Sequence, residues 1–379
     1  MAILFITHKY PPAVGGMENQ SFQLINGYKN IYGSYDIIYT GKEHIALFFL
    51  KLKFRVKKML RQHPDIKIIH LNDGLMGAFF SMLRVNAQGR KVVVTLHGLE
   101  VVFPLSVYQK KILPKLMTFD AFICVSEATK QECKKRNFPD EKLIVVNNGV
   151  ENKGPFIALS DKYDRYISEE LGIDIDHDKI LLAIGRPVRR KGFSWFAREV
   201  IPLLHPSYKF VHIGISHHKE PYLLQILPDK VKNLVDLFFG KPNDVYDLYK
   251  ESTKRPDRII RVGKVDNELR DYLISKATLM IMPNIMVSGD MEGFGLVSLE
   301  ASVKGKTVLA ADIEGITDAI YNGKNGYLVK AGDTHAWREQ IIRHSRLSST
   351  NNEKFRKFTL EHFLTDRMVN GYHDVFNNL

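Results

Sequence analysis

Short apolar runs, each followed by a polar or glycine-containing turn, recur along the whole chain. Many of them are apolar at successive positions, which is typical of strands buried on both faces of a parallel sheet. In the first half the pattern predicts strands at Ala2–Thr7, Asp36–Tyr39, Ile66–Leu71, Lys91–Leu96, Ala121–Val125 and Leu143–Asn147. In the second half it predicts strands at Ile180–Ile184, Lys209–Ile213, Arg258–Val262, Thr278–Met282, Thr307–Ala310 and Gly326–Val329.

Helical stretches lie between these runs, and strands that alternate with helices form doubly wound parallel sheets. Because the series occurs twice, we expect an α/β protein with two Rossmann-like domains, residues 1–165 and 166–365, each with its own sheet. The polar stretch from Gly149 to Ile180 has weak periodicity and is the expected linker. A last helix, about residues 366–379, is expected to pack back on the first domain.

The composition excludes several classes of protein. Of the 379 residues 45% are apolar and 25% are charged, the usual mixture for a globular protein. No apolar run approaches the roughly 20 residues that a membrane span needs, and the first residues do not resemble a signal peptide. Cys124 and Cys133 are too few for a disulfide framework. We therefore expect a cytoplasmic protein.

The charge balance points to an anionic partner. Lys and Arg number 54 against 42 Asp and Glu, a net charge of +12. A surplus of this size is typical of proteins that meet nucleic acid, anionic lipid or phosphorylated substrates, and it does not choose among them. No nucleic-acid motif is present in the chain.

One predicted helix, Phe48–Arg61, separates apolar from basic side chains. Its apolar arc consists of Phe48, Phe49, Leu52, Val56, Met59 and Leu60. Its basic residues are Lys51, Lys53, Arg55, Lys57, Lys58 and Arg61. Such a helix suits an anionic membrane surface. Alternatively, the apolar arc joins the core and the basic side chains are only solvated.

Two loops are suited to binding phosphate groups. Gly15 and Gly16 follow the first predicted strand and precede a helix, where backbone amides can approach an anion. The sequence Ile184-Gly-Arg-Pro-Val-Arg-Arg-Lys-Gly192 follows the first strand of the second half, at the edge where open α/β sheets bind ligands. The four basic residues of this loop, Arg186, Arg189, Arg190 and Lys191, offer the guanidinium and ammonium groups that can hold a diphosphate and neutralise it as a leaving group. An ordinary turn and a solvated basic loop are the alternatives.

A third segment, Met291-Glu-Gly-Phe-Gly-Leu-Val-Ser-Leu-Glu-Ala301, carries two carboxylates. Glu292 precedes a glycine-rich turn, and Glu300 lies roughly 12 Å further if the intervening residues are helical. Retaining glycosidases hold their carboxylates about 5 Å apart, so a hydrolytic pair is a poor interpretation. The two side chains suit the two ends of one hydroxyl-rich ligand. Alternatively, the segment is an ordinary helix with a solvated glutamate at each end. His97 follows the strand Lys91–Leu96. A lone histidine is commonly a structural residue, but its place at a strand end also makes His97 a candidate catalytic residue.

Taken in order, these segments resemble those of the retaining GT-B glycosyltransferases, specifically family four. The similar segments are the Pro-Pro-x-x-Gly-Gly loop at 11–16, Cys124–Glu127, Val146–Val150, the Gly185-Arg…Lys191-Gly192 loop, Glu292–Glu300 and Asn322–Val329. The resemblance covers nearly the whole chain. It implies two Rossmann-like domains facing a cleft, with the acceptor bound by the first domain and the nucleotide sugar by the second.

The resemblance also implies roles for individual residues. Arg186 and Lys191 are similar to the pair that grips the donor diphosphate, Glu300 to the carboxylate that binds the ribose, and Glu292 to the one that contacts the transferred sugar. Phe294, Gly295 and Leu296 would supply backbone amides, Gly15 and Gly16 would face the phosphates, and His97 would lie near the reacting carbon. No cofactor and no metal ion is expected.

The expected reaction is transfer of a hexose from a nucleotide-diphosphate sugar, UDP being favoured, to a glycan or lipid-linked acceptor. Synthesis of cell-surface polysaccharide or lipopolysaccharide is the implied role, at the inner face of the cytoplasmic membrane. Glu314-Gly315 replaces a Gly-Gly turn of many members, and Gly-Gly-Met-Glu18 differs from the loop of glycogen and starch synthases. A sugar-nucleotide epimerase of similar fold and a protein that binds nucleic acid or another anionic surface are the alternatives.

Overall fold

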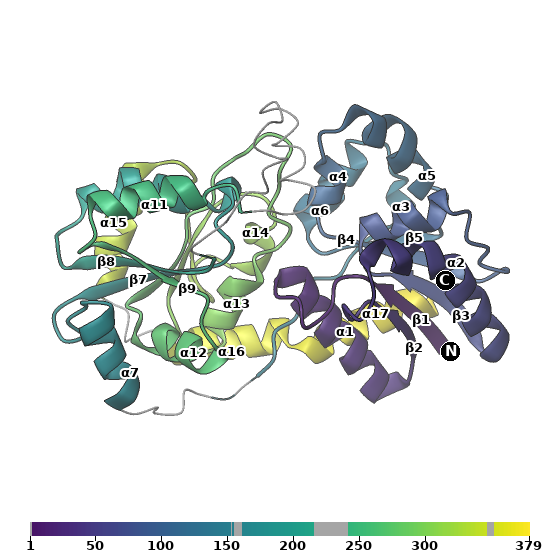
Figure 1. Ribbon diagram of the computed structural model, residues 1–379, viewed down its shortest axis with the longest axis horizontal. Coiled ribbons are helices and arrows are strands. Elements are labelled where there is room, and N and C mark those ends of the chain that lie inside the picture. Colours follow the sequence, from purple (N-terminus) through teal and green to yellow (C-terminus); the bar gives the residue numbers. More distant parts are fainter. Residues whose placement is uncertain (1, 153, 155–160, 216–241, 347–351) are drawn as a thin grey trace. The chain divides into compact units, whose positions relative to one another are not determined.

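The computed structural model describes residues 2–152, 154, 161–215, 242–346 and 352–379. Part of the expected linker, residues 153 and 155–160, lies outside the described residues. The described chain forms two compact units (Figure 1). The first contains Met1–Glu151, Met291–Leu296 and Phe363–Leu379, and the second contains Asn152–Asp290 and Val297–His362.

The first unit has a six-stranded sheet in the order β2-β1-β3-β4-β5-β6, and every neighbouring pair is parallel. Its strands are β1 (Ala2–Thr7), β2 (Tyr35–Ile38), β3 (Ile66–Leu71), β4 (Lys91–Leu96), β5 (Ala121–Cys124) and β6 (Leu143–Val145). Its helices are α1 (Gly16–Tyr32), α2 (Ile45–Gln62), α3 (Gly74–Met82), α4 (Leu99–Val102), α5 (Leu113–Leu116), α6 (Glu127–Lys134) and α17 (Thr365–Asn377). Single turns of other helix types lie at Tyr108–Ile112 and Asp140–Lys142.

Helix α17 completes the core of the first unit, although it is the last element of the chain. Met368, Val369 and Tyr372 are buried in one cluster with side chains of β1, β3, β4 and α1. A Cβ atom at Gly27 of α1 would lie 2.8 Å from Cγ2 of Val369, so the two helices approach as closely as a glycine allows.

The second unit has a six-stranded sheet in the order β12-β11-β10-β7-β8-β9, again parallel throughout. Its strands are β7 (Lys179–Ile184), β8 (Tyr208–Ile213), β9 (Ile259–Gly263), β10 (Leu279–Met282), β11 (Val308–Ala311) and β12 (Tyr327–Val329). Its helices include α7 (Asp161–Arg165), α8 (Phe193–Trp195), α11 (Val245–Lys254), α12 (Asn267–Lys276), α14 (Ile316–Ala319), α15 (Thr334–Ser345) and α16 (Asn352–Phe363). Helix α13 (Leu296–Ser302) starts at Leu296, the last residue of the segment Met291–Leu296 that belongs to the first unit, and its other residues belong to the second unit. Single turns lie at Tyr166–Glu170, Arg189–Lys191, Phe196–Val200 and Ile201–Leu203.

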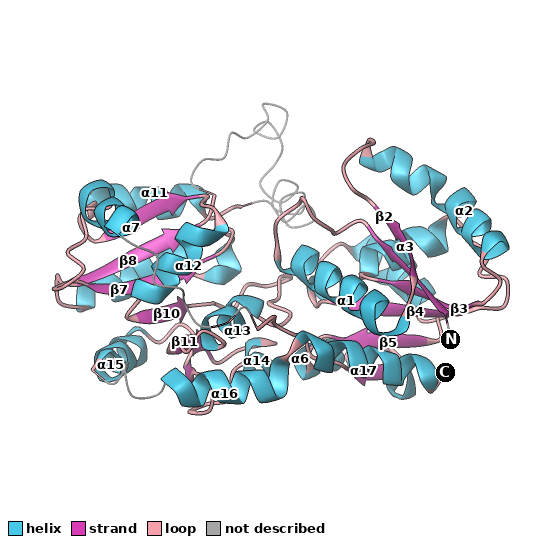
Figure 2. Ribbon diagram, turned by 90° about the horizontal axis from the view of Figure 1, so that it is seen from below, coloured by secondary structure: helices cyan, strands magenta, loops and turns pink. Residues whose placement is uncertain are grey.

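Helices flank the strands of each sheet (Figure 2). In the second unit two separate buried clusters fill the two faces of the sheet. Phe196, Phe210 and Trp337 belong to one, and Leu182 and Leu273 belong to the other. Burial on both faces explains why the strands are apolar at successive positions.

The predicted fold class is confirmed, because both units are α/β with parallel sheets. Every predicted strand is present, and no bound differs by more than two residues. Among the described residues, no helix has both the length and the apolar character needed to cross a bilayer.

Helix α2 packs against the first unit through the apolar arc that the sequence defines. Phe48, Leu52 and Val56 are fully buried, and Phe49 stacks on Phe79 of α3 with ring centroids 4.0 Å apart. Met59 is half-buried. Of the two interpretations of this arc, the structure supports the one in which it joins the core.

Candidate functional site

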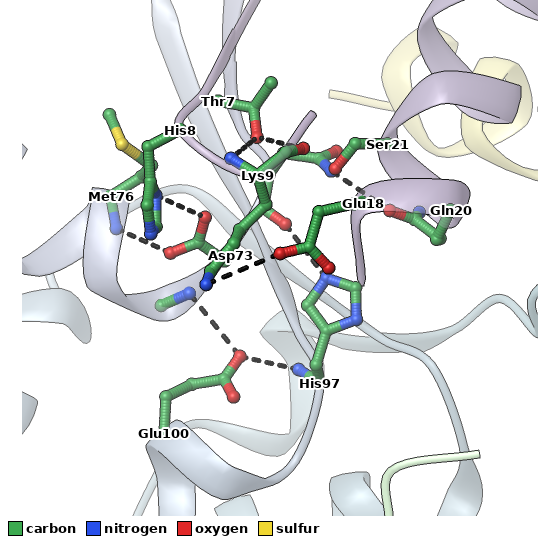
Figure 3. A network of polar contacts seen from close by, with 12 residues as sticks. Thr7, His8, Lys9, Glu18, Gln20, Ser21, Asp73, Met76, His97 and Glu100 are labelled. Atoms are coloured by element: carbon green, nitrogen blue, oxygen red, sulfur yellow. Dashed lines mark hydrogen bonds and ion pairs between the residues drawn. The ribbon is translucent and has the colours of Figure 1, made fainter. Parts of the chain in front are cut away.

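Polar side chains gather at one edge of the first sheet, where β1, β3 and β4 lie next to one another. Because parallel strands end at the same edge, the residues that follow them come together. His8 and Lys9 follow β1, Asp73 follows β3 after Asn72, and His97 follows β4 (Figure 3). Sequence reasoning identified only His97 of this group.

His8 and Asp73 form a buried side-chain pair, with His8 Nδ1 3.2 Å from Asp73 Oδ2. The other carboxylate oxygen of Asp73 caps α3 by accepting the Met76 amide at 2.8 Å. Burial acts to raise the pKa of Asp73, but His8 and the Met76 amide outweigh it and lower that pKa to about 2. The carboxylate is therefore held ionised beside an imidazole at the sheet edge.

His97 is fixed at both its ring and its backbone. Its Nε2 lies 2.9 Å from the backbone oxygen of Asn72. A carbonyl oxygen can only accept a hydrogen bond, so Nε2 carries a proton and donates it, and Nδ1 is the ring nitrogen left to face another partner. The backbone amide of His97 donates to Glu100 at 2.6 Å. Burial raises the pKa of Glu100, whereas His97 acts to lower it.

A second buried network supports Asn72, whose carbonyl orients the His97 ring. Its side-chain amide donates to Gln20, which in turn donates to the hydroxyl of Tyr372 at 3.2 Å. That hydroxyl lies 3.0 Å from Thr95, and Thr95 lies 2.9 Å from His70. Burial lowers the pKa of His70 to about 3, so the ring is neutral and acts as a polar core residue.

The predicted glycine pair lies at the start of α1. Gly15 precedes the helix, no side chain caps its first turn, and Gly16 is its first residue. A Cβ atom at Gly15 would lie 2.3 Å from Glu18 Oε2. Glu18 is buried and lies 3.6 Å from Lys9 Nζ (Figure 3). Gly15 therefore leaves room for a carboxylate that pairs with the sheet-edge lysine.

The basic loop of the second unit follows β7 as predicted. Arg186 is exposed, and Lys191 is half-buried at the end of a single helical turn. Gly192 comes next with φ 66°, and a Cβ atom there would lie 2.0 Å from the carbonyl oxygen of Pro283. Only glycine fits this position, and the close approach holds the basic loop against the segment that follows β10.

Arg190 of the same loop has a different environment. Its Nη1 contacts both carboxylate oxygens of Asp290 at 3.1 Å, and its backbone oxygen accepts the Ile285 amide at 2.9 Å. The side chain of Asp290 is only 5% exposed. Arg190 therefore ties the two loops together.

The segment with two carboxylates is divided between the units. Glu292, Phe294 and Leu296 are buried and belong to the first unit together with Gly295. In that unit a Cβ atom at Gly293 would lie 1.9 Å from the backbone oxygen of His97. The chain therefore passes against the His97 backbone at Gly293, the residue that follows Glu292. Glu300 belongs to α13 in the second unit, where it is half-buried and 3.9 Å from Nη1 of Arg270.

The six basic residues of α2 are all at its surface. Lys51 and Arg55 lie 3.6 Å and 2.6 Å from the carboxylate of Glu43. Lys53, Lys57, Lys58 and Arg61 are exposed.

Among the described residues, no group of three or more His, Cys, Asp or Glu side chains is arranged to hold a metal ion. The first-unit group of His8, Lys9, Glu18, Asp73 and Glu100 was not predicted. The sequence does contain an indication of two of these residues, because polar residues just after buried strands are candidates for a site at the sheet edge. His8 follows β1 directly, and Asp73 comes two residues after β3.

Comparison with known families identifies two matching models. Residues 14–153 match the model described as Glycosyltransferase Family 4, and residues 178–346 match the one described as Glycosyl transferases group 1. Together the two matches span most of the chain.

Similar proteins are known from several bacteria. The N-acetyl-alpha-D-glucosaminyl L-malate synthase of Bacillus anthracis is 25% identical over 83% of this chain and 75% of its own. The capsular polysaccharide biosynthesis glycosyltransferase CapM of Staphylococcus aureus is 25% identical over 87% of this chain and 79% of its own. The crystal structure of Anabaena HepE in complex with UDP-glucose matches the whole of both chains with a TM-score of 0.73 at 17% identity, which shows a common fold.

Proposed function

This chain belongs to the family-four glycosyltransferases, the glycosyl transferases group 1, and from that premise we propose that it is a retaining hexosyltransferase that uses a nucleotide-diphosphate sugar. In the proposed reaction the bond between the anomeric carbon and the diphosphate oxygen breaks. A bond from the acceptor oxygen forms on the same face of the sugar, and the acceptor proton passes to the leaving phosphate oxygen.

The basic loop after β7 carries this proposal. Arg186 and Lys191 lie at the carboxyl edge of the second sheet, where open α/β sheets bind ligands. Two cations there would neutralise the charge that develops on a departing diphosphate. We assign the ribose hydroxyls to Glu300, the transferred sugar to Glu292, and the phosphate and sugar oxygens to the amides of Phe294, Gly295 and Leu296. This arrangement would need no metal ion.

The first unit would supply the groups at the reacting carbon. The Asn72 carbonyl orients the His97 ring through Nε2, so Nδ1 is the ring atom that would accept a hydrogen bond from a sugar hydroxyl. The amides at the start of α1, at Gly15 and Gly16, would meet the phosphates, because a helix N-terminus favours negative charge.

UDP is the favoured nucleotide, because HepE of the same fold was solved with UDP-glucose. The acceptor is a glycan or a lipid-linked sugar of cell-surface polysaccharide or lipopolysaccharide, as the name of the similar CapM suggests. We place the reaction in the cytoplasm, at the inner face of the membrane where lipid-linked acceptors are presented.

The test is the thermal stabilisation of the chain by UDP-, GDP- and ADP-sugars in the presence of a chelator. A donor at 100 times its Kd adds about 2.7 kcal/mol to the free energy of unfolding. We expect stabilisation by UDP-hexoses and its loss in Lys191→Ala, with Lys330→Ala as an exposed control. A chain that no nucleotide sugar stabilises would contradict the proposal.

Transfer assays extend this test. Lys191→Ala and Glu300→Ala should each lower transfer more than about tenfold, or about 1.4 kcal/mol of transition-state stabilisation. Product analysis without an acceptor separates the alternative of a sugar-nucleotide epimerase, since only an epimerase alters the sugar under that condition.

A further inference from the structure

Helix α2 carries a second set of apolar side chains, on the face opposite to the buried arc. Leu50 is 66% exposed, Phe54 is 74% exposed and Leu47 is 40% exposed. Their spacing of three and four residues places them on one stripe of the helix surface. The buried arc anchors α2 in the first unit, so this stripe faces outward.

Basic side chains surround the stripe. The helix-surface neighbours of Phe54, three, four and seven residues away, are Leu47, Leu50, Lys51, Lys57, Lys58 and Arg61. No acidic residue occurs within α2, and among the described residues Lys57, Lys58 and Arg61 have no ion-pair partner. Phe54 is therefore an exposed aromatic side chain that is surrounded on the helix surface by basic residues.

We infer that this face of α2, defined by Leu47, Leu50 and Phe54 with Lys51, Lys57, Lys58 and Arg61, docks the chain on an anionic lipid bilayer. The helix lies along the surface, the three apolar side chains enter the boundary between headgroups and acyl chains, and the basic residues contact lipid phosphates. The long stems of lysine and arginine let their charges stay at headgroup level. The face differs from the one that the helical wheel alone suggests.

A bilayer fits this face better than a protein does. A stable protein interface uses about 20–30 residues on each side, far more than three apolar side chains on one helix. A second copy of the chain would bring an equally basic helix against this one, and like charges repel. The combination of exposed apolar residues with unpaired positive charge is complementary to an anionic lipid surface, which offers both negative charge and an apolar interior.

This inference deepens the proposed location of the enzyme and rests on it for the source of the acceptor. The binding itself depends on α2 alone. Its test therefore uses the full chain with lipid vesicles and with neither donor nor acceptor, so a failure would leave the proposed transfer reaction untouched.

The first measurement is co-flotation with vesicles that contain about 30% phosphatidylglycerol, compared with pure phosphatidylcholine and with vesicles at high salt. We expect binding to the anionic vesicles at low salt only. The variant Leu50→Ser/Phe54→Ser should weaken binding at least about tenfold, and Lys57→Gln/Lys58→Gln should weaken it similarly. The controls are Tyr246→Ser, which removes an equally exposed aromatic ring from α11, and Lys330→Gln/Lys357→Gln, which removes two exposed charges.

A second measurement reports insertion without removing any interaction. The chain has only two tryptophans, so Phe54→Trp adds a fluorophore whose emission can be separated by subtracting the wild-type spectrum. We expect its emission to shift to the blue on anionic vesicles and to become shielded from iodide. Equal flotation of Leu50→Ser/Phe54→Ser and wild type, or an unshifted Phe54→Trp spectrum on bound protein, would overturn the inference. Binding of wild type to short nucleic acid but not to vesicles would also overturn it.

Discussion

A Cβ atom at Gly192 would lie 2.0 Å from the carbonyl oxygen of Pro283, a distance that real Cβ contacts do not reach. Gly192 also has φ 66°, in the left-handed region that favours glycine. The residue before it is Lys191, our main candidate for the donor diphosphate. The position of that cation therefore depends on a contact between two loops that follow neighbouring strands, β7 and β10.

Gly192→Ala is expected to destabilise the second unit and to weaken donor binding together. Gly323→Ala is a matched control, because Gly323 has φ 73° and nothing lies within 4 Å of its Cβ position. Both variants place alanine at a positive φ, but only Gly192→Ala forces a backbone atom to move. We expect it to cost about 1–3 kcal/mol more than the control in urea unfolding. Equal costs would contradict the account of this contact.

The pair of Arg190 and Asp290 is expected to couple the same two loops energetically. A double-mutant cycle with Arg190→Ala and Asp290→Ala should give a coupling of about 1–3 kcal/mol, because both side chains are largely buried. The exposed pair of Lys330 and Asp333 serves as a reference, with an expected coupling below about 0.5 kcal/mol. Similar couplings for the two pairs would mean that Arg190 does not hold the loop.

His97→Gln separates the chemistry of His97 from its structural role. Glutamine can place an amide N–H where Nε2 donates to Asn72, but it has no lone pair at the position of Nδ1. We expect a wild-type melting temperature and a kcat lowered by about tenfold or more, whereas His97→Ala should lower both. An unchanged kcat in His97→Gln would show that His97 takes no part in the reaction.

Acid should weaken the first unit through Asp73. Its pKa is lowered from 3.8 to about 2 in the folded chain. A carboxylate with a depressed pKa contributes stability that is complete above its unfolded value and is lost as the pH falls from about 4 to about 2. The contribution is about 2 kcal/mol.

Asp73→Asn keeps an oxygen that can cap α3 and removes the titrating group, so stability should fall less steeply with acid in that range. His8→Gln should flatten the same range, because it removes the partner that lowers the pKa of Asp73. Urea unfolding at a series of pH values measures both. If the free energy of unfolding fell with acid as steeply in both variants as in the wild type, the His8–Asp73 pair would not be the cause of the acid sensitivity.

The sequence was sufficient to predict where the strands lie, but not which polar residues meet at the edge of each sheet. Buried parallel strands such as Leu279–Met282 are apolar at every position, and this local signal survives without any knowledge of the fold. The meeting of His8 with Asp73 depends on β1 lying beside β3, although β2 comes between them in the chain. The order of strands in a sheet depends on tertiary packing, and the sequence around His8 or Asp73 does not reveal it.

The exposed face of helix α2 could likewise not be predicted from the sequence alone. The helical wheel predicts an apolar arc but does not say which side packs on the core, and it gave no role to Leu50 and Phe54, which lie outside that arc. They became interpretable only when Phe48 and Leu52 were found buried. Likewise, the basic loop after β7 was predicted as one group of cations for a ligand, whereas the structure shows that Arg190 contacts the carboxylate of Asp290.

The stereochemistry of the transferred sugar tests the proposed retaining reaction directly. The full chain would be incubated with a UDP-α-hexose and lipid-linked acceptors extracted from bacterial membranes, and the product would be examined by NMR. A retaining transferase releases one UDP per sugar transferred and gives an α-linked product, and we expect this result. A β-linked product, or a UDP-sugar that is epimerised and never transferred, would contradict it.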